Sequence, residues 1–308
     1  LGTTDAGTTV ASGASLQLGD EGISAISVGA EALSLAGNGA SSEGALRIVK
    51  HAANVGNWTP LGVASQTNFV TETLTVSGSG VVVKPEHQMP VQAHHLTRQD
   101  GAVLSTRATT TNQVYALQLT LTGTLTVTTN SAIDVTGLGY VAGRTVGNVT
   151  AGASTGSAGG SYGGLGGELS GVANAVYGDY HQPNEPSSGG SGWGAGAGGG
   201  LIRITAAAMQ IDGSVRATGQ SVGHPYTAAG SGGGIHLVAG TLSGSGSISA
   251  NGGNGYWGGS GGGGRVAVYY SSLSGFDIAQ NIAADAGQSG DSYGAVGTVY
   301  LQQGTSEG

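Results

Sequence analysis

A pattern of glycine runs, each followed by alternating apolar and polar residues, recurs in the last third of the chain. The sequence GGGLIRITAAAMQIDGSVRATG begins at Gly198, GGGIHLVAGTLSGSGSISANGG at Gly232 and GGGRVAVYYSSLSG at Gly262. The last glycines of these runs, together with Gly297 before TVYLQQ, lie 34, 30 and 33 residues apart. A period in this range indicates a repeat architecture, in which each unit stacks on the next.

Within each unit, the alternation of apolar and polar residues has a period of two, which predicts short strands bounded by glycine clusters. Such strands cannot bury an apolar face alone, and stacking the repeats as coils solves this problem. We therefore predict an all-β chain that forms a right-handed parallel β-helix with long glycine-rich loop excursions. The predicted register forms two interior columns and one outer column: Ile202, Ile235 and Val266; Met209, Leu242 and Leu273; and, outside, Arg203, His236 and Ala267.

The solenoid is expected to extend through the less repetitive part of the chain. We assign residues 1–116 to N-terminal repeats with irregular coils, and residues 117–308 to a glycine-rich continuation of the same solenoid. Residues 124–137 align with 209–219, which places Asp134 and Arg216 at matching outward positions, where they are expected to pair.

A glycine-, serine- and alanine-rich segment, residues 138–199, interrupts this alignment. A loop of this length is uncommon in a compact domain unless it has a function or is disordered. We predict that it packs against the flank of the solenoid. Its glycine-rich stretches are expected to be held by mutual backbone hydrogen bonds in extended or polyproline-II-like form, because ordering glycine has a large entropic cost that must be recovered.

Composition excludes several classes of protein. Glycine accounts for 63 of 308 residues, but the chain is too apolar for a disordered linker and has no Gly-X-Y period of the collagen type. A formal charge of −8 with only 9 Lys and Arg argues against a nucleic-acid partner. No apolar run approaches the roughly 18 residues of a membrane-spanning helix, so membrane insertion is not expected. The absence of cysteine excludes disulfides, thiolate metal sites and cysteine nucleophiles.

Residues 8–49 read TTVASGASLQLGDEGISAISVGAEALSLAGNGASSEGALRIV. This stretch resembles the repeats of bacterial autotransporter passengers and of filamentous-haemagglutinin-like surface proteins, in which a strand pair of the form TTVASGASLQL is followed by ISVGAEALSLAG and GALR. The resemblance implies a right-handed β-helix at the cell surface or outside the cell, within a larger exported protein. It implies an adhesive or structural role and transfers no catalytic residue.

The segment YGDYHQPNE, residues 177–185, concentrates polar and aromatic side chains. Asp179, His181 and Glu185 are candidates for acid–base catalysis, because carboxylates and an imidazole on one turn can converge. Asp179 and Glu185 are also candidate ligands for calcium, which is favoured over zinc because oxygen donors dominate. The alternative is a polar turn in which Asp179 accepts hydrogen bonds from nearby backbone N–H groups, with no metal or other cofactor.

Aromatic residues within the glycine-rich excursions are candidates for a binding surface. Tyr177, Tyr180, Trp193 and Trp257 are the candidate ligand-binding residues, and Tyr226, Tyr256 and Tyr293 occur in similar excursions. They are compatible with three functions. The first is an extracellular structural or adhesive solenoid without enzymatic activity, which associates with itself into filaments, with neighbouring repeat domains or with a glycan surface. The second is a carbohydrate-active enzyme, either a polysaccharide lyase or a glycoside hydrolase. The third is a non-catalytic glycan-binding module.

Overall fold

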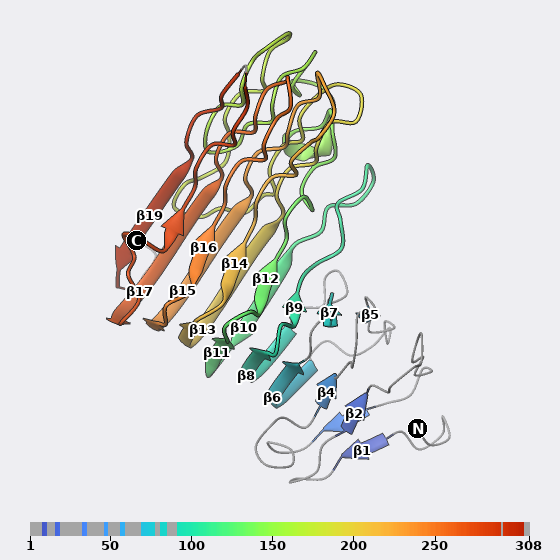
Figure 1. Cartoon of the computed structure of the whole chain (residues 1–308). Helices are drawn as coiled ribbons and strands as arrows, with labels where there is room; N and C mark the ends of the chain where they lie inside the picture. The colour runs from blue at the N-terminus through green and yellow to red at the C-terminus, as the bar shows by residue number, and fades with distance from the viewer. Residues whose placement is uncertain are drawn as a thin grey trace.

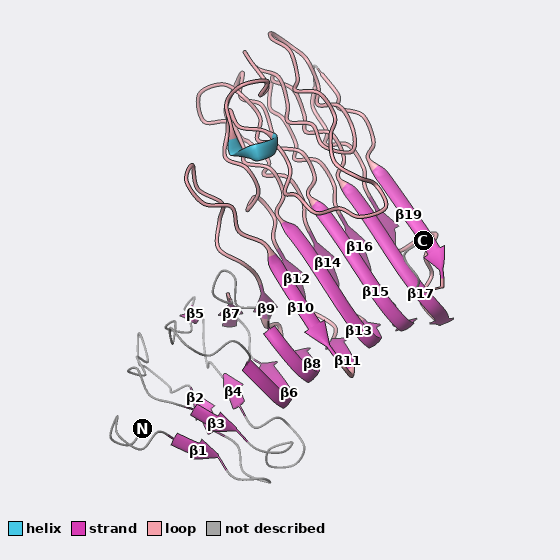
Figure 2. Cartoon of the chain, turned by 180° about the vertical axis from the view of Figure 1, so that it is seen from behind, coloured by secondary structure: helices cyan, strands magenta, loops and turns pink. Residues whose placement is uncertain are grey.

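The computed structural model describes residues 8–10, 16–18, 33–35, 46–48, 56–58, 69–77, 81–84, 91–290 and 292–304. These residues are almost entirely strands and extended loops, with one short 3-10 helix, η2 (Val146–Asn148). The strands stack along one direction, and the long loops extend from one end of the strands (Figures 1 and 2). Among the described residues, no helix has the length and apolar character needed to cross a membrane.

One ten-stranded sheet contains the longer strands, and the pairings within it are parallel. Its order is β19-β17-β15-β13-β10-β8-β6-β4-β2, and β11 pairs with β8 and β13 beside β10. The strands are β2 (Leu16–Leu18), β4 (Leu46–Ile48), β6 (Phe69–Ser77), β8 (Val91–Gln99), β10 (Leu117–Leu121), β11 (Thr124–Val127), β13 (Leu201–Ile211), β15 (Gly234–Ser243), β17 (Arg265–Ser274) and β19 (Thr298–Gln303).

A seven-stranded parallel sheet contains shorter strands, in the order β18-β16-β14-β12-β9-β7-β5. They are β5 (Gly56–Trp58), β7 (Val81–Val83), β9 (Val103–Leu104), β12 (Ala132–Asp134), β14 (Ser214–Arg216), β16 (Ser247–Ser249) and β18 (Ile282–Ala283). A separate pair is formed by β1 (Thr8–Val10) and β3 (Leu33–Leu35). From β13 onwards the chain alternates between the two large sheets, so each coil adds one strand to each sheet. The predicted all-β parallel β-helix with long glycine-rich excursions is confirmed.

The interior columns follow the predicted register. Ile202 pairs with Ile235, which pairs with Val266, and all three side chains are fully buried. In the second column, Leu273 lies beside Leu242 as predicted, but it is 38% exposed. Leu273 is uncovered because the pairing of β17 with β19 ends at Tyr270. The alternation of apolar and polar residues therefore predicted the register correctly. The length of the pairing between β17 and β19 determined which residues of the interior columns are buried.

The column predicted to lie on the outside of the solenoid is largely buried. His236 and Ala267 have the predicted partners, yet they are only 3% and 0% exposed. The segment 177–186 covers this face, where Tyr269 Oη donates a hydrogen bond to His181 O at 3.1 Å. The inserted region therefore packs against the flank of the solenoid, as predicted.

On the opposite sheet, the expected pair forms between neighbouring coils. Arg216 Nη2 lies 2.7 Å from Asp134 Oδ2, and the two residues are in register between β14 and β12. Both side chains are partly exposed to solvent, so the pair contributes at most about 1 kcal/mol to stability.

The loops that join the strands form a glycine bundle, which comprises residues 158–167, 187–200, 217–220, 228–234, 250–255, 258–264, 284–288 and 292–297. Hydrogen bonds run between its segments: Gly232 N–H donates to Gly262 O, Gly262 N–H to Gly160 O, and Gly263 N–H to Ala295 O, each within 3.0 Å. The segment 258–264 is thus bonded to the preceding coil, the following coil and the inserted region. The predicted mutual hydrogen bonding is confirmed.

Glycine is required at successive faces of segment 258–264. A Cβ added at Gly258, Gly261 or Gly264 would overlap a carbonyl oxygen of the preceding coil, and one added at Gly259 or Gly262 would overlap the inserted region. Contacts that recur every third residue agree with the roughly three residues per turn of a polyproline-II helix. The glycine runs therefore reflect close packing of backbone against backbone on several sides.

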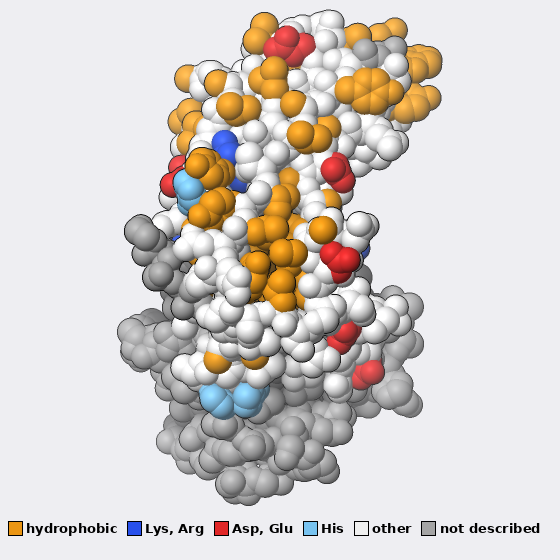
Figure 3. Space-filling model, turned by 90° about the vertical axis from the view of Figure 1, so that its left-hand side faces the viewer, with side chains coloured by type: hydrophobic (Ala, Val, Ile, Leu, Met, Phe, Trp, Pro, Cys, Tyr) orange, Lys and Arg blue, Asp and Glu red, His pale blue; other side chains and the backbone are white. Residues whose placement is uncertain are grey.

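At the end of the solenoid that carries β19, interior side chains are partly exposed. Val299 and Leu301 are in register with Val266 and Val268, which are fully buried, but they are 42% and 37% exposed. Figure 3 views this end and shows a patch of hydrophobic side chains at its centre. Within the described residues, β19 and β18 each pair with another strand on one side only.

Candidate functional site

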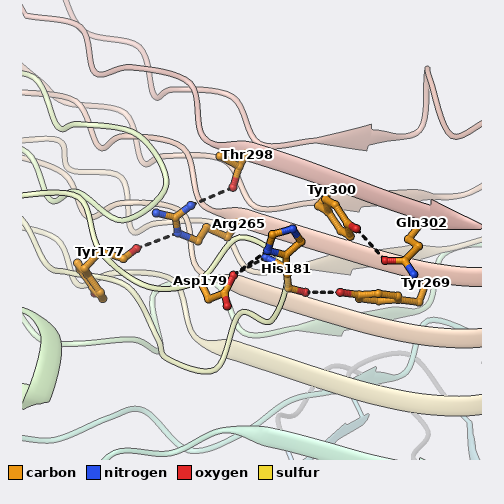
Figure 4. A network of polar contacts seen from close by, with 8 residues as sticks. All are labelled: Tyr177, Asp179, His181, Arg265, Tyr269, Thr298, Tyr300 and Gln302. Carbon is orange, nitrogen blue, oxygen red and sulfur yellow. Dashed lines mark hydrogen bonds and ion pairs between the residues drawn. The ribbon is translucent and has the colours of Figure 1, made fainter. Parts of the chain in front are cut away.

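Arg265, at the start of β17, holds the segment 177–186 in place (Figure 4). Its Nε donates to Tyr177 O at 2.8 Å, its Nη1 to Thr298 Oγ1 at 3.3 Å and its Nη2 to Tyr162 O at 3.4 Å. The guanidinium also lies over the Tyr162 ring, 5.4 Å from its centroid. Hydrogen bonds from a charged donor are among the stronger ones in proteins, so Arg265 links the inserted region to the solenoid.

Asp179 and His181 are brought together, and both side chains remain exposed. Asp179 Oδ1 accepts a hydrogen bond from His181 N at 2.8 Å and lies 3.3 Å from His181 Nδ1. The backbone hydrogen bond from His181 is the main reason that the pKa of Asp179 is lowered. The His181 ring lies beside Tyr180 and Tyr300, with centroid separations of 3.8 and 4.6 Å. This is the geometry of an aspartate turn, the structural alternative considered above.

Glu185 lies in different surroundings. Its Oε2 is buried without a hydrogen-bond partner, and burial raises the pKa of its carboxyl group. Its charge contributes to raising the pKa of three phenols, those of Tyr140, Tyr162 and Tyr177, although burial is the largest cause for each of them. The carboxylate therefore lies beside a buried tyrosine cluster, formed by these three residues.

The two carboxylates suggested for calcium thus differ in environment: Asp179 is exposed, whereas one Glu185 oxygen is buried beside tyrosines. In the part of the chain that the structure describes, no group of three or more histidine, aspartate or glutamate side chains is arranged to hold a metal ion.

The four candidate aromatic residues do not form one binding surface. The hydroxyl of Tyr177 donates to Pro186 O at 2.9 Å and accepts from Ser188 Oγ at 3.1 Å, so it has a structural role. Tyr180 lies beside β19, where its ring is 5.8 Å from Tyr300. The extended segment 258–264 separates Trp257 from Arg265. It therefore also separates Trp257 from the segment 177–186, which Arg265 binds. Seven residues at about 3.1 Å each span roughly 20 Å.

A second aromatic surface lies at the outer end of the glycine bundle. We call the chain reversals at residues 190–196, 221–228, 253–258, and 288–290 with 292–293, the distal turns. Each of them exposes at least one large aromatic side chain: Trp193 is 87% exposed, Tyr226 65%, Tyr256 45%, Trp257 51% and Tyr293 69%. The ring centroids of Tyr256 and Trp257 are 5.4 Å apart, and those of Tyr226 and Trp257 are 6.3 Å apart.

The backbone of the distal turns is held in unusual conformations. Tyr226 and Trp257 have φ angles of 59° and 48°, a region that non-glycine residues rarely adopt. Thr227 forms an antiparallel bridge with Tyr256, and Ser157 Oγ donates to Tyr226 O at 2.8 Å. Neighbouring segments therefore hold these exposed aromatic residues in place.

Sequence reasoning missed two features of this region, the role of Arg265 and the buried tyrosine cluster. Arg265 did carry a signal, because its register column otherwise contains Leu201, Gly234 and Thr298. A single charged residue in an otherwise uncharged column indicates that another segment packs over it and supplies hydrogen-bond acceptors. Tyr140 and Tyr162 lie in the inserted region, which has no repeat partner from which their position can be predicted.

Compared with protein-family models, curated proteins and solved structures, the chain has no match. The resemblance to autotransporter passengers and filamentous-haemagglutinin-like proteins stays a prediction.

Proposed function

We propose that this chain is an extracellular or cell-surface adhesive β-solenoid without enzymatic activity. In this proposal the solenoid is a stiff scaffold, and the glycine bundle carries the distal turns outward to a contact surface. The observation that supports it is the concentration of exposed aromatic side chains on those turns, with Trp193 87% exposed. Large apolar side chains exposed together commonly mark interaction sites.

The other candidate residues are engaged in structural contacts, which favours this function over catalysis. The Tyr177 hydroxyl and the His181 carbonyl hold the inserted loop in place, and Glu185 lies beside the buried tyrosines. Asp179 bonds to the backbone of its own turn.

Binding of the fluorescently labelled protein to a panel of bacterial and eukaryotic cells, measured by flow cytometry, tests the proposal. We expect binding to at least one cell type and its loss in the double variant Trp193→Ala, Trp257→Ala. Tyr180→Ala is the matched control, because it removes an exposed aromatic ring on another face and should bind normally. Binding that is unchanged in the double variant, or absent on every surface, would contradict the proposal.

A second candidate function, a carbohydrate-active enzyme, is favoured by one observation. The Asp179 and His181 side chains lie 3.3 Å apart on an exposed turn, within reach of a bound molecule. Incubation with neutral and acidic polysaccharides, followed by assays for reducing ends and unsaturated sugars, tests it. Product that disappears in the Asp179→Asn variant would support the enzyme and overturn our first proposal.

A further inference from the structure

We propose that the distal turns bind an uncharged polysaccharide, which lies along the solenoid axis across the aromatic rings of successive coils. This inference rests on the proposed adhesive function, because it names the ligand class of the same surface. It draws on the order of the turns, their charge and their rigidity.

The distal turns follow one another along the solenoid axis. Gly196 N–H donates to Ala228 O, and Ala229 N–H donates to Gly259 O. Gly259 in turn forms a parallel bridge with Ser292. Neighbouring strands in a sheet lie about 4.8 Å apart, so each coil advances its aromatic residues by a similar step. A row that repeats in this way matches a ligand built from repeating units.

The ligand chemistry follows from the side chains of the turns. The faces of tryptophan and tyrosine rings pack against the C–H faces of sugar rings, and their polar N–H and O–H groups tolerate water. Residues 188–200, 219–234, 251–264 and 286–297 contain no Lys or Arg. A phosphate, a sulfate or an anionic lipid head group would need such cations. The turns therefore favour a neutral glycan over a nucleic acid, a charged glycan or a membrane.

Side-chain hydrogen bonds connect the turns and make the row rigid. Asn254 N–H donates to Ser221 Oγ, and Asn254 Oδ1 accepts from Gln288 N–H, both at 2.9 Å. This ladder crosses three successive turns. A surface that is ordered before binding loses little conformational entropy when a ligand arrives.

The backbone conformations of Tyr226 and Trp257 also support a binding role for the distal turns. Left-handed conformations of non-glycine residues cost about 1 kcal/mol or more, and they often occur at functional sites. Besides Asp100, Asn130 and Asn148, the residues Tyr226 and Trp257 adopt such conformations, at two neighbouring turns, and their exposed rings lie 6.3 Å apart. Glycine, which is abundant in the surrounding sequence, would adopt these conformations without strain.

Isothermal titration calorimetry with soluble neutral polysaccharides tests the inference, using xylan, mannan, galactan and cello-oligosaccharides of increasing length. Polygalacturonate and heparin serve as charged comparisons. We expect at least one neutral polymer to bind, with affinity that rises with chain length until the row is spanned. Trp257→Ala should weaken this binding at least tenfold. Tyr226→Phe, which keeps the ring, and Tyr180→Ala should bind like the wild type.

The two experiments together separate the inference from the function on which it rests. If Trp193→Ala, Trp257→Ala abolishes cell binding but no neutral polysaccharide binds, or only charged polymers do, the inference is wrong and the adhesive function stands. If neither cells nor polysaccharides bind, both are wrong. Equal thermal unfolding of all variants is required, so that lost binding is not confused with lost folding.

Discussion

Glu185 shows how burial changes the role of a residue that seems catalytic in the sequence. Its Oε2 is buried without a hydrogen-bond partner, beside Tyr140, Tyr162 and Tyr177. A carboxylate oxygen that is buried without a hydrogen-bond partner disfavours the charged form of the group, and protonation relieves this cost. Glu185 is therefore a source of pH-dependent stability.

We expect Glu185→Gln to raise the melting temperature at pH 8 and to leave it nearly unchanged at pH 4. Because the pKa of Glu185 is raised above its ordinary value of 4.5, the folded state binds this proton more tightly than the unfolded state. Stability is thus fully present below pH 4.5 and falls as the pH rises through the folded-state pKa. Calorimetry of both proteins across this range measures the effect. A variant less stable than the wild type at pH 8 would contradict it.

At the scale of the element, the glycine bundle is the unusual part of the molecule. The two large sheets pack against each other through their inward-facing side chains. In the glycine bundle, by contrast, backbone packs against backbone on several sides. Ser260 illustrates the constraint: it is fully buried, donates its N–H to Ser292 O and accepts from Gly294 N–H through its Oγ. A side chain is accommodated there because it forms a hydrogen bond with the next coil.

We expect Gly261→Ala to destabilise the protein by about 3 kcal/mol, because the added methyl group would overlap Gly230 O within a packed interior. Gly223→Ala is the matched control, since a Cβ there meets nothing within 4 Å. Its effect should stay within about 1 kcal/mol. Chemical unfolding of both variants measures the difference. Equal stabilities would show that the bundle tolerates side chains and that its packing is looser than described.

At the scale of the whole molecule, the end that carries β19 offers a surface for another coil. Among the described residues, β19 pairs on one side only, and this edge together with the partly exposed Val299 and Leu301 has the chemistry that each coil presents to the next. Exposed sheet edges are templates for further strand pairing. We therefore propose that self-association, or docking of a neighbouring repeat domain, takes place here.

Sedimentation velocity over a wide concentration range tests self-association. We expect the wild-type protein to form larger species as its concentration rises, and we expect Leu301→Glu to reduce them, because a charge would be buried between coils. Val149→Glu, which changes a residue that is 45% exposed in the inserted region, is the control. A wild-type protein that remains monomeric throughout would argue against association through this edge.

The sequence by itself determined the repeat, the strands and the register. The stacking of Ile202 on Ile235 and the pairing of Asp134 with Arg216 were predictable, because alternation is local and each repeat aligns with the next. The candidate site was predictable only in part. The sequence identified the turn at Asp179 and the exposed tryptophans. It did not show that the turn and the tryptophans lie on separate parts of the surface.

Only the tertiary structure showed which side chains of the solenoid the inserted region covers. The burial of His236, the surroundings of Glu185 and the role of Arg265 all depend on the inserted region 138–199. This region has no repeat to align with, and its contacts join residues far apart in the sequence, such as Tyr177 and Arg265. Periodicity predicts how a coil meets the next coil, whereas the path of an insertion depends on long-range packing, which a local pattern does not contain.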